Sequence, residues 1–174
     1  AVQRKLMLKD MITCLRESLN FEYDTLTVEQ QKAERLEMTP TGASPSESQW
    51  EVVQRFAEYS KFYVQQEDKP RYPFGLVYCM QDLQQGNYVD RYYFTRVRRS
   101  TLLERLHVKP EGKHAVLAHI GTEESHNQAL ASMLQKIRAA SLTTKSDVYV
   151  YDMMSYVMQE AGDYYALKYV IRVE

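Results

Sequence analysis

The feature that most constrains the fold is an order of elements that occurs twice along the chain. Each half holds one strand-like segment, then an amphipathic helical pattern, then two strand-like segments with a turn between them, at Gly86–Asn87 or at Gly162. Duplicated units of this kind pack their apolar faces around one core. We therefore expect an α+β fold with antiparallel sheets, both helices on one face and a cleft where the halves meet. The expected strands are 26–40, which looks irregular or bulged, 74–80, 88–99, 114–121, 147–157 and 164–173.

Capping residues and apolar stripes mark the two expected helices. Ser46, followed three residues on by Gln49, forms a capping-box pattern. Thr122 precedes a second helix with Glu123 and Glu124 in its first turn, where acidic side chains stabilise a helix. The expected buried faces are Trp50, Val53, Phe56, Ala57 and Ser60 in the first helix, and Leu130, Met133, Leu134 and Ile137 in the second.

A narrow helical seam occupies the start of the sequence. Four apolar residues recur there at spacings of four, three and four, with charged residues between them. Because the pattern begins without a capping signal, we interpret residues 1–22 as the end of a longer coiled-coil helix from a larger protein, and residues 26–174 as one domain. An N-terminal helix that packs on its own domain explains the same spacing equally well. The seam consists of Leu8, Ile12, Leu15 and Leu19.

Composition excludes several classes of protein. Hydrophobic residues make up 44% and charged residues 26% of the chain, which is ordinary globular usage. No apolar run approaches the roughly 18 residues of a membrane-spanning helix, and no signal peptide opens the sequence. Cys14 and Cys79 lack metal-ligand spacing, so we expect reduced thiols and a cytoplasmic protein. A net charge of −1 gives no general attraction for nucleic acid, so contact with DNA would need another domain.

No catalytic, metal-binding or cofactor-binding signature is present, and we expect neither a metal nor a cofactor. The sequence lacks a glycine-rich phosphate loop and a nucleophile elbow. His114 and His119 are five residues apart on an expected strand, so they point to opposite faces and do not form a metal pair. The basic residues at 96, 98 and 99 fit a solvated strand end.

One carboxylate interrupts the aromatic segment near the C-terminus. Alternation along 147–157 places Val150 and Asp152 on one strand face and Tyr149 on the other. Burying a carboxylate is costly unless it is paired, and a flat organic cation would supply the missing charge. Nearby tyrosine rings would add cation–π attraction. Alternatively, Asp152 lies at the strand end, where it faces water or caps a backbone group.

Two segments resemble a known family. "HAVLAHIGTEESHNQALASMLQKIRAASLTTKSDVYVYDMM" (114–154) and "YYALKYVIRVE" (164–174) resemble the effector-binding domain of multidrug-responsive MerR-family transcriptional regulators, which belongs to the GyrI-like (gyrase-inhibitory-protein-like) superfamily. "FTRV" at 94–97 is similar as well. The resemblance spans about 26–174 and implies the GyrI-like duplicated fold. It also implies that 1–22 is a linker helix that pairs in a homodimer and leads to a DNA-binding domain absent from this chain.

The resemblance also implies a ligand pocket. In the drug-binding relatives an acidic residue follows "SDVY"; that place falls on Val150, and Asp152 lies two residues on, on the same strand face, as its replacement. Aromatic side chains wall the pocket in these relatives, and one of their tyrosine positions falls on His126. The expected ligand-binding residues are therefore Trp50, Phe74, His126, Tyr149, Val150, Asp152, Tyr165 and Tyr169.

The function expected from these observations is that of a ligand sensor rather than an enzyme. It would bind an aromatic, drug-like molecule, cationic or neutral, and pass the signal to the DNA-binding domain. The alternative is a small-molecule hydrolase, as in some relatives, that activates water with Asp152 and Tyr149 or Tyr165. A stand-alone domain that binds another protein is a third reading; the N-terminal seam argues against it.

Overall fold

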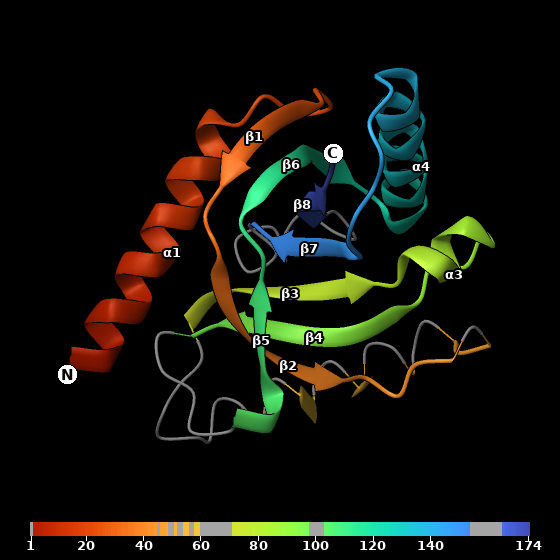
Figure 1. The fold of residues 1–174 in the computed structure, drawn as a ribbon. Coiled ribbons are helices and arrows are strands. Elements are labelled where there is room, and N and C mark those ends of the chain that lie inside the picture. The colour runs from red at the N-terminus through yellow and green to blue at the C-terminus, as the bar shows by residue number, and fades with distance from the viewer. Residues whose placement is uncertain are drawn as a thin grey trace.

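The chain combines a large antiparallel sheet with helices. The computed structural model describes residues 2–44, 46–48, 51, 54–55, 58–59, 71–97, 103–153 and 165–174. The helices described over their whole length are α1 (Val2–Asn20), α3 (Met80–Gln84) and α4 (Glu123–Ala139), and Leu103–Arg105 forms a 3-10 turn. The strands are β1 (Thr27–Gln31), β2 (Glu34–Pro40), β3 (Arg71–Tyr78), β4 (Asp90–Arg96), β5 (Leu106–Lys109), β6 (Gly112–Gly121), β7 (Val148–Asp152) and β8 (Tyr165–Arg172) (Figure 1).

Two long broken strands close the sheet on itself. β1 continues into β2, and β5 continues into β6, across short breaks. The two broken strands pair antiparallel in one register, because Gln31 lies opposite Gly112 and Glu34 opposite Lys109. β2 also pairs with β4, and β6 with β8, so the described strands form a curled sheet in the order β1-β6-β8-β7-β3-β4-β2-β5. Figure 1 shows the two broken strands crossing the other strands of the sheet.

The α+β duplication expected from the sequence is confirmed. The first unit runs from β1–β2 through helical residues at 51, 54–55 and 58–59 to β3 and β4, and the second from β5–β6 through α4 to β7 and β8. The units meet where β3 pairs with β7. The irregularity expected in the strand 26–40 is the break between β1 and β2. The expected buried residues Trp50, Val53, Phe56, Ala57 and Ser60, the turn at Gly162, and strand residues beyond 97 and 153 lie outside the described residues.

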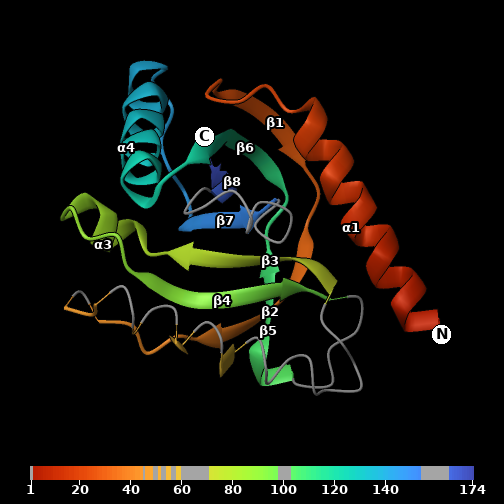
Figure 2. The same ribbon diagram turned by 180° about the vertical axis from the view of Figure 1, so that it is seen from behind.

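The helix α1 lies on the side of the strands away from α4 (Figure 2). Its Cys14 and Ser18 are buried against the end of β7, whereas the seam side chains Leu8, Ile12 and Leu19 are 55%, 49% and 78% exposed. The seam therefore does not form the contact between α1 and its own domain. Within the described part of the chain, no helix combines the length and the apolar character needed to cross a membrane.

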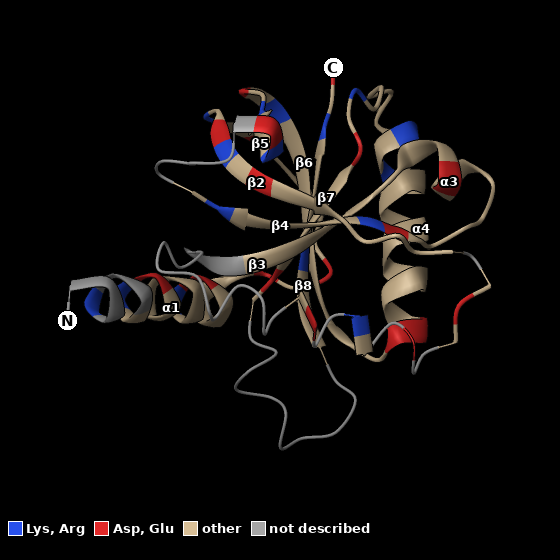
Figure 3. Ribbon diagram, turned by 90° about the horizontal axis from the view of Figure 1, so that it is seen from below, with Lys and Arg blue, Asp and Glu red and all other residues tan. Residues whose placement is uncertain are grey.

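The helix α4 begins and ends as its sequence predicts. Thr122 is the N-cap, and its Oγ1 accepts a hydrogen bond from the Ser125 backbone N–H at 3.4 Å. Acidic side chains occupy the first turn and Lys136 and Arg138 the last, which complements the helix dipole (Figure 3). The apolar stripe faces the sheet, as expected: Leu130, Met133 and Ile137 are buried, and Leu134 packs beside them.

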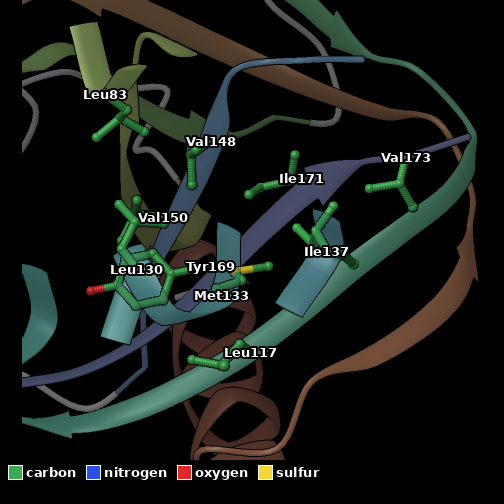
Figure 4. Close-up of a cluster of buried hydrophobic side chains, with 11 residues drawn as sticks. Leu83, Leu117, Leu130, Met133, Ile137, Val148, Val150, Tyr169, Ile171 and Val173 are labelled. Carbon is green, nitrogen blue, oxygen red and sulfur yellow. The ribbon is translucent and has the colours of Figure 1, made fainter. Parts of the chain in front are cut away.

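Two apolar cores cover the two faces of the sheet. The core under α4 joins helix residues such as Leu130 and Met133 to Val150 and Tyr169 of the sheet (Figure 4). The second core lies on the inner face, where the sheet curls round, and Phe21, just after α1, packs against it. The inner core consists of Leu36, Val77, Phe94, Val116, Tyr149, Tyr151 and Val170.

One local expectation falls outside the described residues and one is corrected. A capping box is formed by Ser48 and Glu51: Glu51 Oε2 accepts from the Ser48 backbone N–H and from its hydroxyl, both at 2.7 Å. Gln49 of the expected Ser46–Gln49 pair lies outside the described residues. A charged carboxylate is a stronger acceptor than an amide. The connection at Gly86, whose φ is +81°, is no tight hairpin turn, because α3 precedes it and buries Leu83 in the α4-side core.

Replacing Ser48 with Ala should lower the free energy of unfolding by about 1 kcal/mol, the usual loss on removing an N-cap side chain. Ser46→Ala is the matched control and should change it by less than about 0.5 kcal/mol, as for an ordinary surface substitution. Urea unfolding of both variants measures the difference. Equal losses would contradict a cap at Ser48.

Candidate functional site

The sheet face under α4 collects most of the residues expected to bind a ligand. Side chains alternate along β7, so Val150 and Asp152 share this face. Val150 lies opposite Tyr169 of β8 and is packed in the core under α4 (Figure 4). Phe74 of β3 and Tyr165 of β8 fall on the same face by the same alternation. The two repeats thus contribute side chains to one surface, which we call the effector face: Phe74, Val150, Asp152, Tyr165 and Tyr169.

His126 of α4 closes one end of the effector face. Its Nε2 donates to the Tyr165 carbonyl at 3.0 Å, and its Nδ1 accepts from the Tyr169 hydroxyl at 2.8 Å. Burial lowers the pKa of His126 and raises that of the Tyr169 hydroxyl, so both groups are neutral. The pair supplies a hydrogen-bonded polar link in an otherwise apolar surface.

Asp152 lies at the end of β7, next to the residue whose backbone contacts α1. It is the last residue of β7 and is half-buried, opposite Leu167. The next carbonyl, that of Met153, accepts from Cys14 Sγ at 3.5 Å and from the Ser18 hydroxyl at 3.2 Å. Burial raises the pKa of Cys14 to about 11, so this side chain remains a thiol donor. The expected acid is therefore one residue from the point where α1 is bonded to the sheet.

One of the expected residues that the structure describes is not on this surface. Tyr149 points to the inner face, where its hydroxyl lies 2.8 Å from His107 Nε2. Asp152 and Tyr149, a pair considered for a hydrolase, thus occupy opposite faces of β7, whereas Asp152 and Tyr165 share one. Trp50 lies outside the described residues.

A polar cavity on the inner face has no counterpart among the sequence motifs. It has a volume of about 330 Å³ and lies beside the break between β1 and β2. Glu34 accepts there from the Tyr151 hydroxyl at 2.7 Å, from Lys109 Nζ at 3.0 Å and from the Arg96 guanidinium. Lys168 completes the basic wall of the cavity. No local motif could reveal it, because its residues come from strands far apart in the sequence.

The pair of Glu34 and Lys109 is buried and fully hydrogen-bonded. Only 4% of the Lys109 side chain and 13% of the Glu34 side chain are exposed. Lys109 Nζ also donates to Gln31 Oε1 at 3.1 Å and to the Tyr151 hydroxyl at 2.9 Å. Burial opposes ionisation of Glu34, but Lys109 and Arg96 outweigh it and leave its pKa below the usual value. Such an arrangement fixes the register of β2 and β5.

The histidines do not assemble a metal site. Across the described ranges, no three His, Cys, Asp or Glu side chains converge as metal ligands would. His114 is fully buried, and its Nδ1 lies 3.0 Å from the Gly112 carbonyl. His119 lies instead near the start of α4, on the other strand face, as the odd spacing predicts.

The buried histidines predict that acid destabilises the fold. Burial lowers the pKa of His114 and His126 below 6.5, so at moderately acid pH the unfolded chain binds more protons than the folded one. The free energy of unfolding should therefore fall as the pH drops below about 7, until the folded-state pKa values are passed. Urea unfolding between about pH 8 and pH 5 measures this. His126→Gln should flatten the slope, and an equal slope in that variant would contradict the assignment.

Comparison with known proteins identifies the architecture. No described protein family and no curated protein matches the sequence. Among solved structures, the C-terminal domain of EcmrR superposes with a TM-score of 0.64 at 8% identity, over 86% of this chain and 97% of that one. EcmrR in its cryo-EM complex with DNA superposes with a TM-score of 0.67 at 9% identity, over 99% of this chain and 68% of that one. A hydrolase from Listeria innocua superposes with a TM-score of 0.53 at 10% identity, over 91% of this chain and 96% of that one.

The fold is GyrI-like. The resemblance read from the sequence is thereby confirmed at the level of the fold, including the duplicated unit. This fold occurs both in EcmrR, which has been solved in a complex with DNA, and in a hydrolase, so the architecture alone does not assign a chemistry. The choice between them depends on the residues of the effector face.

Proposed function

We propose that this chain is the effector-binding domain of a cytoplasmic MerR-type transcriptional regulator, and that it senses an aromatic cation on the effector face. The observation that carries this proposal is the meeting of Asp152 and α1 at the end of β7. A ligand cation beside Asp152 would act one residue from the contacts that hold α1. A sensing site and an output helix thus share one short segment of backbone.

The chemistry of the effector face fits such a ligand. Tyr165 is exposed and Phe74 and Asp152 are half-buried, so two aromatic rings and a carboxylate on this face are accessible in part. Charge attraction is stronger there than at an open surface, and ring faces add cation–π attraction. Val150 at the family's acid position is fully buried in the core under α4, so Asp152 rather than Val150 would meet a ligand.

The helix α1 fits the role of an output element. Its exposed seam, Leu8, Ile12 and Leu19, offers an apolar stripe to the same helix of a second copy, which would make the regulator a homodimer. The match to EcmrR in its DNA complex covers 99% of this chain, against 86% for the isolated EcmrR domain, and the difference is about the length of α1. DNA would be bound by an N-terminal domain joined to this helix.

The signal requires a ligand that binds one position of α1 better than another, because a ligand with equal affinity for both positions shifts nothing. Cys14 and Ser18 are the contacts whose geometry would differ, since both lie within hydrogen-bond distance of the Met153 carbonyl, and the Ser18 hydroxyl also lies 2.8 Å from the Cys14 carbonyl. A cation that draws Asp152 toward itself would move the neighbouring carbonyl and weaken or tighten these bonds.

Replacing Asp152 with Asn should weaken binding of 1-methylquinolinium about tenfold, or about 1.4 kcal/mol, because the variant keeps the shape but loses the charge. Binding of the neutral isostere 1-methylnaphthalene should not change. Quenching of Trp50, the single tryptophan, and the ligand-dependent rise in melting temperature measure both affinities. Glu111→Gln, which removes an exposed carboxylate from the turn between β5 and β6, is the control. Equal cation affinity in Asp152→Asn and the parent chain would refute the role of Asp152.

A hydrolase remains the second candidate, because the Listeria innocua hydrolase has the same fold and Asp152 shares a face with Tyr165. A sensor returns its ligand unchanged, whereas an enzyme converts it. Chromatography of the ligand after prolonged incubation with the protein therefore distinguishes the two.

A further inference from the structure

Three side chains at the start of α4 form a hydrogen-bonded chain that the sensor function does not use. His119 Nδ1 lies 2.6 Å from Asp24 Oδ1, and His119 Nε2 lies 2.9 Å from Ser125 Oγ. The carboxylate can only accept, so Nδ1 carries the proton and Nε2 is free to accept from the serine hydroxyl. This is the order of contacts in a nucleophile, base and orienting acid.

The backbone holds each member in place from a different element. Asp24 lies in the turn after α1 at a φ of +62°, an uncommon conformation for a residue with a side chain. Its N–H donates to the Ala118 carbonyl at 2.8 Å, and its carbonyl accepts from Lys136 Nζ at 3.3 Å. The turn is thus bonded both to β6, which carries His119, and to α4, which carries Ser125.

Gly121 makes the close approach of strand and helix possible. A Cβ atom at this position would overlap Ser125 Oγ and lie 2.8 Å from His119 Nε2. The space between base and hydroxyl therefore exists only because residue 121 has no side chain. The His119 side chain remains 17% exposed and Ser125 is half-buried, so neither side chain is sealed from solvent.

We propose that Ser125, His119 and Asp24 form a catalytic relay that hydrolyses small carboxylic esters. As Ser125 Oγ bonds to the ester carbonyl carbon, its proton moves to His119 Nε2 and the carbonyl π electrons move to oxygen. Collapse of this adduct breaks the bond to the alcohol oxygen, which takes the proton from His119. Water then releases the acid from Ser125 by the same route, so ester and water give acid and alcohol with no change in oxidation state.

The surroundings of Ser125 favour this chemistry and restrict the substrate. Ser125 lies in the first turn of a helix of 17 residues, whose N-terminal end favours the negative charge that develops on the carbonyl oxygen. Asp24, Glu123 and Glu124 are exposed carboxylates around it, so neutral or positively charged esters are preferred over anionic ones. His126 packs edge-on against His119 with ring centres 4.9 Å apart, so the relay adjoins the effector face without sharing its acid.

A purely structural role is the competing explanation, because the Ser125 hydroxyl also lies 2.9 Å from the Thr122 carbonyl and can tie the cap together. The hydroxyl has one proton, which it gives either to that carbonyl or to His119. A structural role predicts lower stability for Ser125→Ala and no chemistry, whereas the relay predicts a covalent reaction at this serine.

Hydrolysis of p-nitrophenyl acetate by the purified chain, with a fluorophosphonate probe and peptide mass spectrometry, tests the proposal. The probe should label Ser125, and Ser125→Ala or His119→Gln should lower the enzymatic rate at least about a hundredfold. Asp24→Asn, which loses a positioning residue, should lower kcat with KM nearly unchanged, and Asp24→Glu should recover part of kcat. Ser44→Ala, a change at an exposed serine elsewhere, should behave as the parent chain does.

Two results would overturn the proposal: a probe that leaves Ser125 unmodified while the melting temperature shows a folded protein, or a rate that Ser125→Ala does not change. A rate that Ser125→Ala does not change would mean that an imidazole hydrolyses the ester without the serine. Labelling of Ser125 and its rate effect test the relay, whereas the affinity for 1-methylquinolinium tests the sensor function, so failure of the relay and failure of the sensor function are separable.

Discussion

Replacing Glu34 with Gln should lower the free energy of unfolding by about 3 to 5 kcal/mol, the usual cost of leaving a buried charge without its partner. Lys109 is 4% exposed and stays in place, held by Gln31 and Tyr151, but it then lacks a carboxylate. Arg96 loses the same acceptor. Urea unfolding at neutral pH measures the loss.

Two further variants show whether the missing charge is the cause. Adding Lys109→Met to Glu34→Gln removes the unpaired ammonium and should recover at least about half of the loss. The control is Glu17→Gln, which breaks an exposed ion pair: Glu17 Oε2 lies 3.5 Å from Lys168 Nζ, and the Glu17 side chain is 54% exposed. This variant should lower the free energy of unfolding by less than about 1 kcal/mol. Similar losses for Glu17→Gln and Glu34→Gln would show that burial of the pair is unimportant.

The pH dependence of the same variant gives an independent check. The pKa of Glu34 is below its usual value in the folded chain, so the stability from this carboxylate is present above the unfolded value of 4.5 and is lost as the pH falls through the folded value. Glu34→Gln should therefore lose less of its remaining stability than the parent chain does as the pH falls below about 4.5.

The elements of the fold were predictable because their signals are local. Alternation in β7 and β8, the cap at Thr122 and the stripe on α4 each depend on residues within a few positions of one another. The same reasoning placed Val150 and Asp152 on one face, as observed. The capping box shows the limit of such signals: Ser46–Gln49 and Ser48–Glu51 both fit the pattern, and the structure shows the bond of Ser48 with the charged acceptor Glu51.

The polar sites depend on distant pairings and were not predictable in the same way. Glu34 meets Lys109 only because β2 pairs with β5, and His119 meets Asp24 across 95 residues of sequence. A histidine that looks isolated in the sequence thus acquires both its partners from the tertiary fold. The contact of α1 with Met153 is of the same kind, because periodicity located the helix but did not show which of its sides meets the sheet.

Replacing Gly75 with Ala should cost about 3 kcal/mol or more, because the centre of the sheet has no room for a methyl group. A Cβ atom at Gly75 would overlap the Phe94 ring opposite it in β4 and lie 2.6 Å from the Val150 carbonyl. The ring cannot retreat easily. It is fully buried and packs edge-on against Tyr151, with centres 5.1 Å apart. Urea unfolding of the variant measures the cost.

The reason for the large cost is that two immobile groups would clash at once, one a ring and one a backbone atom. In a Phe94→Leu background the added cost of Gly75→Ala should therefore shrink without vanishing, since the Val150 carbonyl remains. Gly42→Ala is the matched control: its Cβ would meet open space, so only the strain of a φ of +71° is left, about 1 kcal/mol. Equal losses at Gly75 and Gly42 would show that backbone strain, rather than the close contact of β3 with Phe94, explains the glycine. Because β3 joins the two repeats through β7, a shift of β3 at Gly75 would also move Val150 and the effector face.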